Sequence, residues 1–221
     1  MTYYKAVRPD GTSFYDPGFR WLPEDGQIPE GGWLVEHPDQ SGCMSYPSQY
    51  LSVSVEPANC IGFEWPCRLL EVEAVGEIAS PRSDRLPNRR AGKAFRVMRE
   101  VDATLALGPN GSRVAALIDR AARLTHEEMQ RMGAVLDVAG GVAPDAVVDG
   151  AAREVRTAAR TAARTAAWDA IWGSACNDTW EAERDALLAE VVRDRISPAD
   201  YDTLTAAWRA GVGDDWAGAL L

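Results

Sequence analysis

The sequence predicts an α+β protein, with a small, mostly antiparallel β-domain over residues 1–107 and an all-helical arm or bundle over residues 108–221. Two observations lead to this prediction. Short stretches of alternating or β-branched residues, separated by turn sequences, fill the first half. After the Gly-Pro-Asn-Gly turn at residues 108–111, apolar residues recur at the helical spacing of about 3.6. Within the helical half, Gly140, Gly141 and Pro144 indicate a linker at about residues 140–144.

Alternating segments in the first half define the expected strands. Turn sequences such as Pro9-Asp10-Gly11 and Gly31-Gly32 separate these segments. Residues 57–63 are compatible with one short helix. The expected strands include residues 3–7, 32–36, 50–55, 68–75 and 94–99.

Two helix starts follow the central turn. Ser112 is placed to cap a helix whose apolar residues repeat at helical spacing. Thr125 and Glu128 form a capping-box pattern, which predicts a second helix from His126 to about residue 139. The apolar face of the first helix contains Val114, Leu117, Ile118 and Ala121.

A long helix is predicted from residue 145 to about residues 173–177, where a Thr-Ala-Ala-Arg unit repeats. Four residues is close to one helical turn, so positions four apart form a row along the helix. This row changes from cationic to aromatic along its length. Arginine and aromatic side chains are common interface anchors, and this row supplies the candidate partner-binding residues. They are Arg156, Arg160, Arg164, Trp168 and Trp172.

The alanine pairs beside this row leave a slim face that another helix can approach closely. Two interpretations are open for this face: a hairpin with residues 126–139 or 179–195 of the same chain, or a seam in a homodimer or with a partner. The arginines themselves are suited either to binding phosphate or an acidic partner, or to forming a solvated helix face.

Two more helices are expected near the end of the chain. One covers residues 179–195, and the other begins after Ser197, which is the expected N-cap, with Pro198 at the first helical position. Gly211 and Gly213 are expected to end the last helix. Its apolar positions are Tyr201, Leu204 and Trp208.

Composition narrows the classes of function. The formal net charge is −10, from 23 basic and 33 acidic residues, which disfavours nonspecific nucleic-acid binding. The sequence shows no signal-peptide pattern and no apolar run of about 20 residues, so we expect a cytoplasmic protein without membrane contact. The chain has only two histidines and no Cys-x-x-Cys pair, which argues against a metal site. Buried thiols are the favoured interpretation of Cys43, Cys60, Cys67 and Cys176.

An enzymatic alternative comes from the first half of the chain. A Tyr-Lys strand, a Ser-x-Ser strand and an acidic strand together resemble mono-ADP-ribosyltransferases, with Lys5 where that family carries Arg or His. The resemblance implies a degenerate enzyme that uses NAD. Tyr4, Ser52 and Glu73 would then line the NAD cleft.

Several short motifs also resemble a family of uncharacterised phage and prophage proteins. The motifs lie within residues 3–102 and include Tyr4-Lys5-Ala6, the Glu71-Val72-Glu73 strand with Gly76-Glu77, and the basic segment at residues 95–100. The second half is similar to the arms of actinobacterial and actinophage proteins that are rich in alanine, arginine and tryptophan.

Together these features favour a noncatalytic intracellular accessory protein of phage type. We expect it to bind a host protein, such as a defence protein, or to self-assemble as a homo-oligomer through its helical half. This interpretation requires no cofactor, whereas the enzymatic alternative requires NAD.

Overall fold

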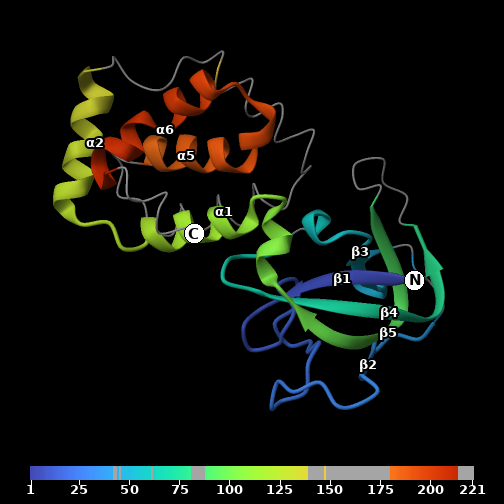
Figure 1. Cartoon of the computed structure of the whole chain (residues 1–221). Coiled ribbons are helices and arrows are strands. Elements are labelled where there is room, and N and C mark those ends of the chain that lie inside the picture. Colours follow the sequence, from blue (N-terminus) through green and yellow to red (C-terminus); the bar gives the residue numbers. More distant parts are fainter. Residues whose placement is uncertain are drawn as a thin grey trace. The chain divides into compact units, whose positions relative to one another are not determined.

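The computed structural model divides into two compact units, Met1–Ala106 and Leu107–Leu221, called here the β-unit and the helical unit. Residues 1–41, 44, 46–60, 62–80, 88–138, 147 and 180–213 are the part that the structure describes. The described strands all lie in the β-unit, and the described α-helices all lie in the helical unit (Figure 1). The predicted α+β class is therefore confirmed.

The β-unit contains a five-stranded antiparallel sheet within its described residues. The strand order is β2-β5-β3-β1-β4, and β5 also pairs with β4, so that β1, β4, β5 and β3 close a ring. The strands are β1 (Thr2–Val7), β2 (Trp33–Glu36), β3 (Leu51–Ser54), β4 (Arg68–Ala79) and β5 (Arg89–Val101).

Strand β5 is shared by three neighbours. Along one edge, its first residues pair with β3, as in Leu51↔Gly92, and its middle residues pair with β2, as in Trp33↔Val97. Along the other edge it pairs with β4 over most of its length. Strand β5 therefore pairs with strands that lie up to about sixty residues earlier in the sequence.

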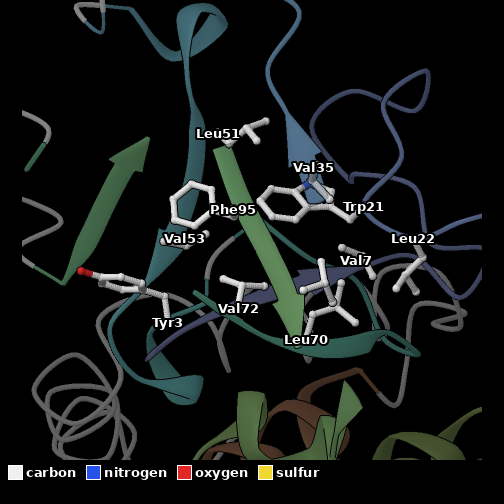
Figure 2. Packing of buried hydrophobic residues seen from close by; sticks show 11 residues of the cluster. Tyr3, Val7, Trp21, Leu22, Val35, Leu51, Val53, Leu70, Val72 and Phe95 are labelled. Carbon is white, nitrogen blue, oxygen red and sulfur yellow. The ribbon is translucent and has the colours of Figure 1, made fainter. Parts of the chain in front are cut away.

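Aromatic and branched side chains fill the inside of this sheet (Figure 2). The rings of Trp21 and Phe95 lie 6.1 Å apart between centroids, and Tyr3 meets Phe95 edge to face at 6.3 Å. Such tilted and edge-to-face pairs are the arrangements that aromatic quadrupoles favour. The other members of the cluster are Val7, Leu22, Val35, Leu51, Val53, Leu70, Val72 and Val97.

Strands β4 and β5 are longer than the sequence predicts. Alternation indicates strands over residues 68–75 and 94–99, but pairing continues through Ile78↔Gly92 and Ala79↔Ala91. Each strand supplies the hydrogen-bonding partner that extends the other, and that contact is not visible in local sequence. The short helix considered for residues 57–63 is a three-residue 3-10 turn, η2 (Pro57–Asn59). Two further 3-10 turns are η1 (Pro47–Gln49) and η3 (Ala103–Leu107).

Local capping signals place the described helices of the helical unit. Glu128 accepts from the Thr125 N–H at 2.8 Å and its own N–H donates to Thr125 Oγ1, which confirms the predicted capping box. Ser197 Oγ accepts from the Asp200 N–H at 3.1 Å, which confirms the predicted N-cap. The helices are α1 (Gly111–Ala121), α2 (His126–Val138), α5 (Trp180–Val191), η4 (Arg193–Arg195) and α6 (Pro198–Val212).

Two details differ from the expected helix ends. Asn110, not Ser112, is the N-cap of α1, and Gly211 lies inside α6, whose C-cap is Gly213 with a φ of 82°. A Cβ on Gly211 would lie 2.3 Å from Met132 Cγ, so only glycine permits this approach of α2 and α6. The predicted apolar face of α1, residues 114, 117, 118 and 121, is buried as expected.

A buried ionic cluster joins three helices of the helical unit. The Glu190 carboxylate is fully buried on α5 and accepts from the Arg113 guanidinium on α1 at 2.7 and 3.1 Å. It also accepts from the Tyr201 hydroxyl on α6. Because a buried carboxylate needs such partners, this cluster fixes the mutual placement of α1, α5 and α6.

Candidate functional site

A cleft of about 750 Å³ opens in the β-unit. This volume lies within the range of small-molecule pockets. Its lining combines five aromatic rings with two strongly basic side chains, and it draws on three strands and three loops. The lining includes Lys5, Phe14, Tyr15, Asp16, Phe19, Trp21, His37, Asp39, Tyr50, Ser52 and Arg89.

The loop after β1 supplies most of the aromatic wall. It folds back on itself through bonds from the Trp21 N–H to Gly11 O and from the Ser13 N–H to Phe19 O, both 2.9 Å. Gly11 has a φ of +84°, and a Cβ there would lie 2.8 Å from Leu22 Cβ, so this fold of the loop requires glycine. Trp21 is thereby buried, while Tyr15 remains 76% exposed at the rim.

Lys93 holds another part of the lining in place. Its Nζ donates to Asp39 O at 2.7 Å and to Gln49 O at 2.6 Å, and it lies 3.7 Å from the Asp39 carboxylate. The His37 N–H donates to Lys93 O at 2.8 Å. These contacts tie the segment after β2 to the segment before β3. Hydrogen bonds from Ser41 lower the pKa of Asp39, so this carboxylate remains ionised.

Lys5 lies on the apolar side of β1. Its Cα is paired with that of Leu70, which is fully buried, and directly paired residues of antiparallel strands share a face. The Lys5 Nζ stands 5.2 Å from the centre of the Trp21 ring. Burial, and to a smaller extent the nearby Arg89 charge, lower the pKa of Lys5 to about 8, against the influence of Cys60.

Arg89, the first residue of β5, is the second cation of the cleft. Its guanidinium lies over the Tyr50 ring at 5.8 Å. Its buried Nε finds no hydrogen-bond acceptor among the described residues. A buried donor without an acceptor costs about 1–3 kcal/mol.

The structure brings together only two of the three residues that the enzymatic alternative requires. Tyr4 pairs with Ser54, and Tyr4 and Ser52 both line a small cavity of about 20 Å³ beside Cys60. Glu73 lines neither this cavity nor the larger cleft, and its Cα faces Thr2 and Arg96. Ser52 is thus the one member of the trio that lines the larger cleft.

The predicted partner-binding row lies outside the described residues. The structure does not describe any of its five residues, Arg156, Arg160, Arg164, Trp168 and Trp172. The expected linker at residues 140–144 also lies outside the described residues. Their role therefore stays a prediction.

Cysteine and metal chemistry can be assessed for the described part of the chain. Cys60 and Cys67 are buried free thiols, and burial raises their pKa values to about 11 and about 12. The described residues contain no group of three or more side chains suited to hold a metal ion. No described helix has the length and apolar character needed to cross a membrane.

No protein-family model matches the chain, and no curated protein or solved structure is significantly similar to it. The chemistry of the cleft is therefore the strongest guide to function.

Lys5, Trp21 and Arg89 were missed as site residues by sequence reasoning. One signal for Lys5 was present, because strict alternation in β1 places it on the same face as Tyr3 and Val7. A charged residue on an apolar strand face marks either a structural ion pair or a site. Trp21 and Arg89 gave no comparable signal, because the loop fold and the β3–β5 pairing bring them to the cleft.

Proposed function

We propose that the β-unit binds a small molecule that carries a flat ring and an anionic group. The observation that carries this proposal is the pair of cations, Lys5 and Arg89, which line one aromatic cleft without a carboxylate partner among the described residues. Aromatic walls suit a flat ring, and a guanidinium suits a carboxylate or phosphate.

The acidic residues of the cleft do not neutralise these cations directly. Asp39 is engaged by Ser41 and Lys93, and Asp16 accepts from the Gly18 N–H at 2.9 Å within its own loop. Arg89 and Lys5 instead face aromatic rings. An arriving anion would therefore meet the Arg89 guanidinium without competition from a carboxylate of the described residues.

Small-molecule binding in the β-unit differs from the noncatalytic function expected from the sequence, which is host-protein binding or self-assembly through the helical half. A host or self-assembly partner for the helical half remains a separate proposal. The NAD-using alternative differs in its residues, because it depends on Tyr4 and Glu73, whereas binding in the cleft depends on Arg89.

The test is isothermal titration calorimetry of the full chain with matched pairs of probes. AMP is compared with adenosine, and 4-hydroxybenzoate with 4-hydroxybenzamide. We expect the anionic member of at least one pair to bind at least about tenfold more tightly than its neutral analogue, which corresponds to about 1.4 kcal/mol. Arg89→Gln should remove this preference, while Arg96→Gln, on the same strand, should retain it.

Two results would overturn the proposal. One is a Kd above about 1 mM for both anions. The other is equal binding by wild type and Arg89→Gln. NAD serves as a further probe: binding that is lost in Glu73→Gln but kept in Arg89→Gln would instead favour the enzymatic alternative.

A further inference from the structure

The two lysines of this chain have opposite environments. Lys93 donates to two backbone carbonyls at 2.6 and 2.7 Å and faces the Asp39 carboxylate. The Lys5 side chain makes no hydrogen bond or ion pair with any described residue, and its Nζ lies over the face of Trp21. One amine is therefore held by acceptors, while the other lies against an apolar wall beside a cation.

The two amines also differ in whether they line the cleft. Lys5 lines the 750 Å³ cleft and also the small cavity beside Cys60, so a small molecule in the cleft reaches its side chain. The chain places Arg89 beside the same cleft, where it would hold an anionic group of that molecule. An amine that is desolvated and close to a second cation is the standard environment of a nucleophilic lysine.

We infer that the Lys5 side-chain amine is a nucleophile that forms an imine with a small aldehyde or ketone bound in the cleft. This inference rests on the proposed function, because the carbonyl compound belongs to the same class of anionic, ring-bearing ligand. The amine nitrogen forms a bond to the carbonyl carbon, and the carbonyl oxygen leaves as water. Overall, an ammonium and a carbonyl compound give a protonated imine and one water, without oxidation or reduction.

The protonation state of Lys5 supports this chemistry. Burial lowers the pKa of Lys5 to about 8. At neutral pH about a tenth of such an amine is unprotonated, whereas an ordinary lysine with a pKa near 10.4 is almost entirely charged. Imine formation begins with the neutral amine, so Lys5 is prepared for this step.

The experiment is reductive trapping on the folded full chain at pH 7. The protein is incubated with limiting 4-formylbenzoate and sodium cyanoborohydride, and peptide mass spectrometry measures modification at Lys5 and Lys93. We expect Lys5 to be modified at least about tenfold faster than Lys93, because Lys5 is reached from the cleft while the Lys93 amine is held by two carbonyl acceptors. The same reaction in urea should modify both lysines at similar rates, because unfolding removes the two environments.

Arg89→Gln should slow trapping at Lys5, and Arg96→Gln should leave it unchanged. A folded protein that reacts at Lys5 no faster than at Lys93 would overturn the inference.

Failure of the inference and failure of the proposed function can be told apart. If 4-hydroxybenzoate binds through Arg89 but Lys5 is not trapped, only the imine chemistry is wrong. If reductive trapping with benzaldehyde modifies Lys5 selectively while neither AMP nor 4-hydroxybenzoate binds, only the anion-binding function is wrong.

Discussion

Replacing Lys5 with methionine should stabilise the β-unit at neutral pH. In the folded protein Lys5 has a pKa of about 8, against an ordinary value of 10.5. At 1.36 kcal/mol for each pH unit, burying the charged amine costs up to about 3 kcal/mol. Methionine avoids this cost but loses the contact of Nζ with Trp21, which contributes about 1 kcal/mol. We therefore expect Lys5→Met to stabilise the β-unit by about 2 kcal/mol at pH 7.

The sign of the pH dependence follows from the lowered pKa. As the pH rises through 8, folded Lys5 loses its proton while unfolded Lys5 keeps it up to about 10.5. The wild type therefore gains stability between pH 8 and 10.5, and the advantage of Lys5→Met shrinks. Between pH 7 and pH 9 this advantage should fall by about 1 kcal/mol.

Urea unfolding followed by methyl NMR measures this difference in the β-unit alone. The folded methyl signals of Val7 and Leu70, both fully buried near Lys5, report on this unit without interference from the helical unit. Comparing variant with wild type at each pH cancels the titration of other groups. Lys93→Met is the control, and it should lower stability by about 1–3 kcal/mol because two carbonyls lose their donor. A Lys5→Met effect that is destabilising at pH 7, or equal at both pH values, would refute the reasoning.

Three further predictions concern the cleft and the helical unit. AMP affinity, measured by calorimetry, should fall by up to about tenfold between pH 7 and pH 9 as Lys5 loses its charge, and a constant affinity would remove Lys5 from the site. Glu190→Ala should destabilise the helical unit by about 3–5 kcal/mol, because it leaves Arg113 without its buried partner. Hydrogen exchange of α6 amides checks this change against Asp202→Ala, an exposed ion-pair partner for which about 1 kcal/mol or less is expected. Thr125→Ala should speed exchange in the first turn of α2 by an amount equivalent to about 1 kcal/mol, and unchanged exchange would show that its cap is dispensable.

Features fixed by neighbouring residues were predictable from the sequence. Thr125 with Glu128, and Ser197 with Pro198, each carry a complete cap within four positions, and both helix starts were predicted correctly. The burial of the α1 face also follows from local spacing alone. In contrast, the added length of β4 and β5 arises from their contact with each other, and neither segment alternates clearly enough near Gly92 to indicate it.

The cleft was less predictable because it is assembled from distant parts of the chain. Lys93 donates to Asp39 and Gln49, which lie 54 and 44 positions earlier, and thereby positions one wall. Trp21 reaches Lys5 through the fold of its loop. Only Lys5 itself was marked in the sequence, as a charge within the apolar alternation of Tyr3 and Val7.

The shared position of β5 has a consequence for synthesis on the ribosome. Within the described residues β2 pairs only with β5, and β3 has one further pair, Tyr4↔Ser54. Until Arg89 and the residues after it leave the exit tunnel, the nascent chain must carry the apolar sides of β2 and β3 without their main partner. Because unpaired strands of this kind bind chaperones or aggregate, we expect a pause in translation before β5 has emerged to favour both outcomes.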